Sequence, residues 1–341
     1  MNIKQIAKKA GVSVATVSRV LNHPESVAPK TKEKIQRIID EEEYTPNWFA
    51  QGLNFNRTKT IGLLLPHNMN TAYMEIANGV EEVAHQKGYI TFICNMEKDA
   101  QTEKEYIEKL INRKVDGLIL MYSTLDEEYA SWIEEEKVPA VFIGDNNIRQ
   151  TWPSVNADCR TGAAEMTAHL IKCGHEKIAM FCGADPGPEV QSMLQGYKNV
   201  LKAAGCRVDE KMIIPVDNSI EGGYIGMKKL LNSRTGLPDA IFATSDEIIY
   251  GAMDAIKENG IRIPEDIAVA GFGNDRMSSL MEPKLTTVDL PYRKMGIYGA
   301  RILFDLIEEG PGDRKTQKIQ LQTRMRVRKS CGHRERIGEM F

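Results

Sequence analysis

The chain has few cysteines, no long apolar run and none of the common catalytic signatures, and each shortage narrows its class. Its six cysteines among 341 residues form no CxxC pair and show no regular spacing, which argues against a disulfide scaffold and for a reducing compartment. No apolar stretch could span a bilayer, and no signal peptide precedes the first predicted helix. We therefore expect a cytoplasmic protein without a membrane partner.

Signatures of catalysis are missing as well. Neither GxSxG nor HExxH occurs, and the Gly/Pro-rich stretch 183–188 lacks the Lys-Ser/Thr ending of a phosphate-binding loop. That stretch is better explained as a turn. We expect no enzymatic activity and no cofactor, although a fold alone would not exclude catalysis.

Three soft ligands, His169, Cys173 and His175, lie close enough in sequence to raise the question of a metal site. No second cluster of soft ligands accompanies them, and structural zinc sites need about four. The sequence therefore favours ordinary structural residues over a metal centre.

Charge is distributed unevenly along the chain. Residues 1–37 hold eight Lys and Arg against two acids, a net charge of +6, so the other 304 residues carry −9. A small basic head on a larger acidic body is typical of a protein whose head binds phosphates and whose body has another task.

Residues 3–22 predict two short helices joined by a tight turn. Apolar residues recur at i, i+3, i+4 and i+7 over 3–10, which suits one buried helical face. Gly11 can end the first helix, and the Ser13 hydroxyl can cap the second. The apolar face of the second helix consists of Val17, Val20 and Leu21. This pattern predicts a helix–turn–helix, with a plain helical hairpin as the alternative.

The other side of the second helix carries small and hydrogen-bonding residues that suit the major groove of DNA. The candidates for DNA contact there are Val14, Ala15, Thr16, Ser18, Arg19 and Asn22. Arginine can bridge O6 and N7 of guanine, whereas Val14 and Ala15 can make apolar contact with a thymine methyl. A third helix is predicted from Pro29 to Glu43, and Lys30 and Thr31 at its start can contact phosphates.

From Thr60 onward the chain alternates short apolar runs with amphipathic stretches. The predicted strands cover residues 61–66, 89–94, 116–121, 139–144, 177–182, 211–216, 239–244 and 266–271. Nearly continuous apolar strands between helices indicate parallel sheets covered on both faces. Eight strands in two sets predict an α/β body of two similar doubly wound subdomains.

Motifs spread over the chain carry a family resemblance. They are A-x-x-A-G-V-S-x-x-T-V-S-R-V-L-N at Ala7–Asn22, T-K-E-K-I at Thr31–Ile35, Y-T-P-N at Tyr44–Asn47, A-Q-x-L at Ala50–Leu53, V-D-G-L-I at Val115–Ile119, T-S-D-E at Thr244–Glu247, I-P-E-D-I-A-V-A-G-F at Ile263–Phe272 and L-T-T-V at Leu285–Val288. In this order and spacing, the chain from Ile3 to about Arg328 resembles the LacI/GalR family of bacterial transcription regulators.

The resemblance implies a division of the chain into four parts. They are a helix–turn–helix head at 1–45, a hinge helix at 46–58, a periplasmic-binding-protein-like body for effector binding and dimerisation at 59–328, and a tail at 329–341. The chain would cross between the two subdomains near residues 160, 290 and 320. The hinge segment is too short to form a stable helix alone, so it would fold when two copies pack over DNA. In the family a hinge leucine opens the central base step from the minor groove; Leu53 occupies that position here, with Asn47 and Gln51 as neighbouring contacts. A flexible linker is the alternative.

Candidate effector contacts lie just after predicted strands, because ligands of parallel sheets bind beyond the carboxyl ends of the strands. They are Tyr73, Ser123, Asp145, Asn218 and Asp246. Tyr73 matches the family's aromatic platform for a sugar ring or base, and a core aromatic at a helix start is the alternative. Asp246, next to Ser245, can equally belong to a helix cap.

Two positions depart from the family pattern. Met193 stands where the family has an arginine, and Gly273 stands where it has a carboxylate. Losing both removes groups that discriminate polyols or phosphates. Either Asp275 and Arg276 substitute from nearby, or the effector is unusual, or control by a small molecule is weak.

The function implied is a DNA-binding repressor of carbohydrate or related metabolic genes. It would bind a pseudo-palindromic double-stranded operator as a homodimer, under control of a small-molecule effector such as a sugar or sugar derivative. The first alternative is control by a protein corepressor, as in the family's carbon-catabolite regulator, which docks a phosphorylated carrier protein. The second is an enzyme on the same scaffold.

Overall fold

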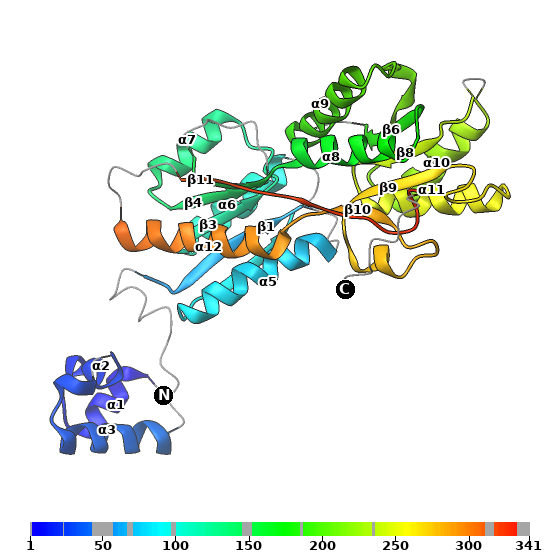
Figure 1. Cartoon of the computed structure of the whole chain (residues 1–341). Helices are drawn as coiled ribbons and strands as arrows, with labels where there is room; N and C mark the ends of the chain where they lie inside the picture. Colours follow the sequence, from blue (N-terminus) through cyan, green and yellow to red (C-terminus); the bar gives the residue numbers. More distant parts are fainter. Residues whose placement is uncertain are drawn as a thin grey trace. The chain divides into compact units, whose positions relative to one another are not determined.

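A computed structural model of the chain describes residues 2–22, 24–42, 57–66, 71–96, 100–144, 152–184, 187–233, 236–310 and 317–332, without the side chains of Asn22 and Ala100. It separates into two compact units, Met1–Lys59 and Thr60–Phe341 (Figure 1). Most of the predicted hinge, including Asn47, Gln51 and Leu53, lies outside the described residues, as do Asp145 and 333–341 of the tail. The predicted domain boundaries stay predictions.

The described part of the first unit is a bundle of three short helices, α1 (Ile3–Ala10), α2 (Val14–Asn22) and α3 (Pro29–Glu41), with the 3-10 turn η1 (Pro24–Ser26) before α3. Asn2 and Gln5 form a reciprocal capping box at the start of α1, and Gly11 ends it with a left-handed φ of 67°. The Ser13 Oγ accepts a hydrogen bond of 3.1 Å from the backbone N–H of Thr16, so the predicted cap of α2 is confirmed.

The apolar faces predicted for the head meet in one core. Its buried members are Ile6, Ala7, Ala10, Val17, Val20, Ile35, Ile38 and Ile39. Ile3 and Leu21 pack against this core and are partly buried. The helical periodicity therefore predicted the packing correctly.

The body contains two six-stranded sheets (Figure 1). The first has the order β11-β5-β4-β3-β1-β2, with β1 (Thr60–Leu65), β2 (Ile90–Asn95), β3 (Gly117–Met121), β4 (Ala140–Ile143), β5 (Ser154–Ala157) and β11 (Lys318–Leu321). The second has the order β12-β10-β9-β8-β6-β7, with β6 (Ile178–Gly183), β7 (Ile213–Val216), β8 (Ala240–Ala243), β9 (Ala268–Gly273), β10 (Thr286–Asp289) and β12 (Arg324–Arg326). The described strand pairs are parallel except β10 with β12, which are antiparallel.

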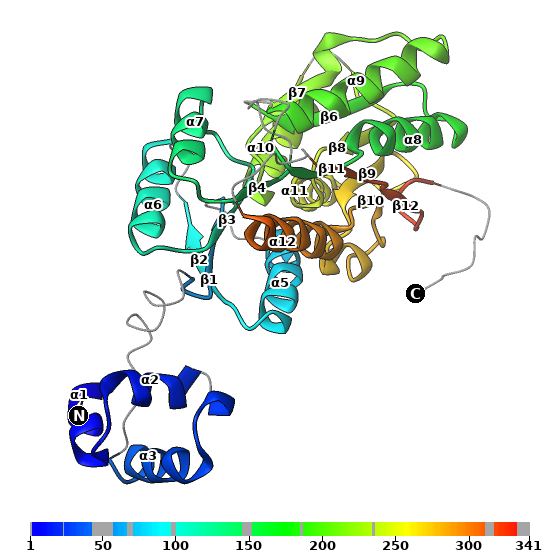
Figure 2. The ribbon, with the colours of Figure 1, turned by 90° about the vertical axis from the view of Figure 1, so that its left-hand side faces the viewer.

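Helices cover both faces of each sheet. The first sheet lies between α5 (Thr71–Gln86) with α12 (Tyr292–Glu309) and α6 (Ala100–Asn112) with α7 (Glu127–Glu135), as Figure 2 shows. The second lies between α8 (Cys159–Lys172) with α9 (Pro188–Ala203) and α10 (Ile220–Leu231) with α11 (Asp246–Glu258). Successive strand residues face opposite layers: Leu63 belongs to the core with α5, and Leu64 to the core with α6. The doubly wound fold is thus confirmed.

All eight predicted strands are present, and four further strands, β5, β10, β11 and β12, were not predicted. The four lie where the chain passes between the sheets, from β5 to α8, from β10 to α12 and from β11 to β12. They escaped prediction because they are short and carry polar side chains, such as Arg324 and Arg326 in β12.

The expectation that every strand is covered on both faces is wrong for β2. At this edge of the first sheet Ile90, Phe92 and Ile93 are 56%, 37% and 51% exposed. Apolarity alone did not reveal that the strand lies at an edge. Within the described residues, no helix has the length and apolarity to cross a membrane.

Candidate nucleic-acid interface and effector site

The residues predicted to read DNA lie along the solvent side of α2. Val14, Ala15 and Arg19 are exposed, whereas Thr16 and Ser18 are half-buried. The hydroxyls of Thr16 and Ser13 lie 2.9 Å apart. Val14 is 40% exposed, so its methyl groups are available for apolar contact with a base edge. Asn22 ends the helix, and its side chain lies outside the described part.

A second cationic feature is the start of α3. Pro29 occupies the first helical turn and Ala28 offers no side-chain cap, so the amide groups there remain available to an anion. Lys30, Lys32 and Lys34 are exposed, and Thr31 is half-buried. Lys9 differs from these lysines, because its ammonium pairs with Glu42 inside the head.

In the body, close packing of two helices brings two tyrosines to one place. A Cβ on Gly79 of α5 would lie 2.2 Å from the carbonyl oxygen of Arg293, and one on Gly296 of α12 would lie 2.0 Å from that of Ile76. The glycines therefore let α5 and α12 approach, with Tyr73 and Tyr292 near their first residues.

A third tyrosine, Tyr122, follows β3 directly. Its ring centroid lies 5.6 Å from that of Tyr73, with the planes at 50°. Gly144, which ends β4 with a φ of 87°, leaves room for this ring, since a Cβ there would lie 2.5 Å from it. These tyrosines form an aromatic wall of the kind that stacks on sugar rings.

Acidic side chains lie near this wall and act on its tyrosines. Burial raises the pKa of Tyr73, Tyr122 and Tyr292, and the charge of Glu189 raises each further. Glu189 lies in the first turn of α9 and accepts a hydrogen bond of 3.1 Å from the thiol of Cys159. Among the described residues, the groups whose charges shift these three pKa values are acidic.

Asp246, predicted as an effector contact or part of a helix cap, is 3% exposed at the first position of α11. Its carboxylate accepts 2.5 Å and 3.0 Å hydrogen bonds from the Thr287 hydroxyl and the Asp275 amide. Burial raises the pKa of Asp246 to about 7, although the bond from Thr287 opposes that rise. Ser245 caps the helix and donates to Asn218, 2.6 Å away.

Glycine at position 273 has a conformational reason. Gly273 ends β9 with a φ of 135°, a backbone conformation that disfavours other residues. A side chain there would point between the Tyr292 hydroxyl and the Asp246 carboxylate, 3.5 and 3.6 Å from its Cβ. Asp275 does not fill that space, because its carboxylate caps η3 (Arg276–Ser279) and accepts a hydrogen bond from Tyr250.

The remaining predicted contacts lie in different surroundings. Met193 is 3% exposed and packs in the core between the second sheet and α9. Ser123 is buried and donates a 2.5 Å hydrogen bond to Glu103, while Asn218 is exposed. The structure thus brings together Tyr73, Asp246 and Gly273.

Sequence reasoning missed Tyr122, Tyr292 and Glu189. Tyr122 could have been found, because it follows the predicted strand 116–121 directly. Tyr292 and Glu189 follow a crossover and a turn, and no local pattern distinguishes them from surface residues.

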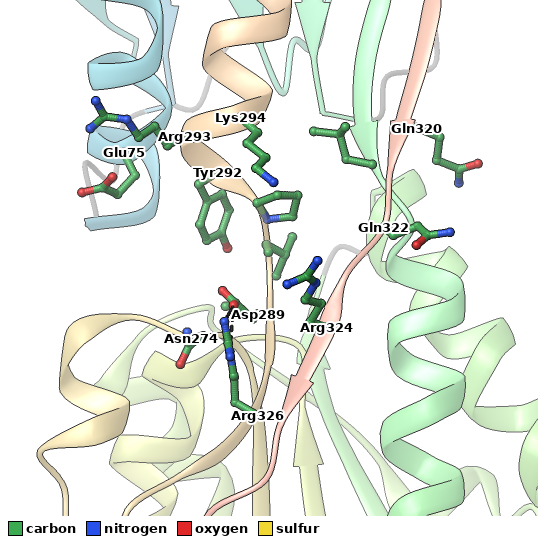
Figure 3. Close-up of a pocket in the computed structure, with 14 residues that line it drawn as sticks. Glu75, Asn274, Asp289, Tyr292, Arg293, Lys294, Gln320, Gln322, Arg324 and Arg326 are labelled. Carbon is green, nitrogen blue, oxygen red and sulfur yellow. Dashed lines mark hydrogen bonds and ion pairs between the residues drawn. The ribbon is translucent and has the colours of Figure 1, made fainter. Parts of the chain in front are cut away.

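A groove with a volume of about 670 Å³ opens beside the second and third crossovers (Figure 3). Lys294 and Arg324 point toward one another across it, and neither forms an ion pair with another described residue. Two other arginines at the groove are paired, Arg326 with Asp289 and Arg293 with Glu82, each at 2.8 Å. Cations without an acidic partner at a groove can hold an anionic group.

Comparison with known proteins places the chain in a family. Residues 2–47 match the helix–turn–helix of bacterial regulatory proteins of the lacI family. Residues 58–329 match the periplasmic binding proteins and sugar-binding domain of the LacI family. The chain belongs to the LacI family, so it is a DNA-binding transcriptional regulator.

Individual relatives agree with this assignment. Catabolite control protein A of Staphylococcus xylosus is 34% identical over 310 residues, covering 91% of this chain and 93% of that protein. The Lac repressor dimer bound to operator and the anti-inducer ONPF superposes with a TM-score of 0.83 at 27% identity, over 97% of this chain and 99% of that one. The complex of the regulator CelR with cellobiose superposes with a TM-score of 0.74 at 30% identity, again over 97% of this chain and 99% of that one.

Proposed function

We propose that the protein represses carbohydrate or related metabolic genes as a cytoplasmic homodimer on a pseudo-palindromic operator, and that it has no enzymatic activity. The observation that carries the proposal is the exposed row Val14, Ala15 and Arg19 on α2. These side chains have no packing role in the head, and a recognition helix presents such residues to base edges. Lys30 and Thr31 would hold phosphates beside them.

The hinge supplies the switch in this proposal. Leu53 from each chain opens the central base step, with Asn47 and Gln51 beside it, once two hinge segments pack together on DNA. The effector changes the angle between the two subdomains and thereby orders or melts the hinge, because it binds one arrangement more tightly than the other.

A neutral sugar is the effector class that these aromatic and acidic side chains favour. Tyr73, Tyr122 and Tyr292 offer faces to a pyranose ring, whereas Glu189 and Asp246 offer acceptors to its hydroxyls. Glu189 and Asp246 themselves would repel a phosphate or carboxylate placed against them. The complex of CelR with cellobiose shows a sugar bound to a protein of the same fold.

The homodimer is supported by exposed apolar surface in the body. Ile90, Phe92 and Ile93 make the edge strand β2 apolar and exposed, a kind of strand edge that proteins usually cover. A second copy would cover them.

A protein corepressor is the second candidate, and the groove of Figure 3 favours it. Lys294 and Arg324 could hold an anionic group presented by a partner. Control by a neutral sugar predicts that sugar alone shifts the melting temperature, whereas control by a partner predicts no shift without the partner.

Selection of bound duplexes from a random DNA pool with the full-length protein tests the central claim. An inverted repeat with a fixed central step is expected, and a Leu53→Ala variant should weaken specific binding while sparing the salt-dependent, non-specific part. Equal loss on random DNA would reject the wedge. No enrichment by the wild type would reject readout by the unliganded protein and move the search to partners.

A further inference from the structure

Three side chains with soft ligand atoms converge inside the second subdomain. His169 lies in the last turn of α8, Cys173 is the C-cap residue of that helix, and Cys331 comes from the segment that follows β12. Their ligand atoms all lie within 4.8 Å of one another. The sequence grouped His169 and Cys173 with His175, whereas the third member of the cluster is Cys331. Cys331 lies 156 residues after His175, so no rule of local spacing could have found it.

Two of the three distances between the ligand atoms match the edges of a tetrahedral zinc site. The Nε2 of His169 lies 3.3 Å from the Cys331 sulfur and 3.6 Å from the Cys173 sulfur. Zinc bonds of about 2.3 Å to sulfur and 2.0 Å to nitrogen place such atoms about 3.6 Å apart at a tetrahedral angle. Thiols, in contrast, are weak hydrogen-bond donors and weak partners for a buried imidazole.

Neighbouring hydrogen bonds hold the third ligand in place. The Nε2–H of His175 donates to the carbonyl oxygen of Cys331 at 2.9 Å, and the Thr286 hydroxyl donates to its sulfur at 3.2 Å. Ser330, the preceding residue, donates to the carbonyl of Val269 at 2.7 Å and accepts from the amide of Thr286 at 2.8 Å. Such outer contacts are what orient metal ligands.

The site has an entrance. Cys331 and His169 are 0% and 8% exposed, while Cys173 is half-buried at the helix end. Among the described residues, no fourth His, Cys, Asp or Glu joins the group. The fourth position would therefore hold water at the side of Cys173.

We propose that His169, Cys173 and Cys331 bind one Zn²⁺ per chain. Both thiols ionise on binding, so two protons are released for each ion bound. The ion fastens the segment after the third crossover to α8, the helix that begins at the first crossover. Bound zinc thus stabilises the body, and the proposal is independent of the effector.

The test is metal binding by the full-length protein, stripped with a chelator in a phosphine reductant and then given ZnCl₂ or CoCl₂. We expect one zinc per chain after gel filtration, thiolate-to-cobalt charge-transfer absorption, a higher melting temperature, and slower alkylation of Cys173 by iodoacetamide. Cys173→Ser and His169→Gln should bind zinc at least about tenfold more weakly.

Cys206→Ser is the matched control, because Cys206 is also half-buried and lies outside the cluster. It should retain zinc like the wild type. Replacement of the fully buried Cys331 could prevent folding. The half-buried Cys173 is therefore the cysteine replaced in this test, which keeps the proposal falsifiable. A wild type that keeps no zinc, or equal zinc in Cys173→Ser and Cys206→Ser, would overturn the site and leave a hydrogen-bonded cluster.

Discussion

The head and the body place their functional groups in opposite ways. In the head the residues proposed to touch DNA are exposed on one short helix, and eight buried residues suffice to hold them. In the body the groups proposed to bind the effector come from four helices and several strand ends, and Asp246 among them is almost fully buried. The exposed DNA-contact residues of the head can therefore be replaced one at a time without changing its stability. Replacing the buried groups of the effector site in the body also changes the stability of the body.

The largest expected effect is on the core of the head. Ile6→Ala removes a fully buried side chain and should cost about 2–5 kcal/mol, enough to unfold a unit this small. Operator binding should disappear in fluorescence anisotropy, while the calorimetric transition of the body stays in place. The corresponding variant in the body, Ile76→Ala, also removes a fully buried side chain and should lower the temperature of the body transition. If both variants shift the same transition, the two units do not unfold independently.

Asp246→Asn should change how the stability of the body depends on pH. Burial raises the pKa of Asp246 in the fold from 3.8 to about 7, so its protonated form favours folding. That contribution, on the order of 4 kcal/mol, is complete below about pH 4 and is lost as the pH rises through 7. Urea unfolding across this range should show a weaker pH dependence for the variant. Asp254→Asn, an exposed acid on the same helix, should leave the profile unchanged, and an unchanged profile in Asp246→Asn would contradict the assignment.

A smaller effect is expected from Arg19→Ala, at about 1–3 kcal/mol. Base preference should relax at one position of each half-site in duplex selection, without loss of head stability, because Arg19 is exposed. Arg37→Ala, which removes an exposed charge from α3, should weaken binding to all sequences alike. Identical selected motifs for wild type and Arg19→Ala would refute direct readout by this residue.

The smallest effect concerns phosphate contact. Lys32→Gln should reduce the slope of the logarithm of the DNA-binding constant against the logarithm of the salt concentration, by about one per contacting chain. It should leave the selected DNA motif intact. Lys202→Gln, at an exposed position of the body helix α9, should leave the slope as it is. Equal slopes for both variants would mean that Lys32 lies away from the DNA.

Local periodicity predicted most of the fold. The buried faces of α1 and α2 and the eight apolar strands follow from rules that act over a few residues. The four crossover strands could not be predicted in this way, since β10 and β12 pair only because distant segments meet at the sheet edge. The exposed face of β2 has the same origin, because edge position depends on the order of strands and not on their composition.

The candidate site was less accessible to sequence reasoning than the fold. Tyr73 could be placed from its position after a strand, and the same rule would have found Tyr122, which the sequence reasoning missed. Glu189 and Tyr292 become neighbours of Tyr73 only through packing between elements more than one hundred residues apart. The pairing of Cys331 with His169 is equally remote in sequence.

The return of β11 to the first sheet has a consequence for synthesis on the ribosome. The described helices of the head, α1 to α3, end at residue 41, so this bundle can fold as soon as that segment emerges. The first sheet needs residues 318–321 to pair with β5, so it can close only when nearly the whole chain has been made. A nascent chain therefore carries a folded DNA-reading head for most of its translation, before the part that controls it exists.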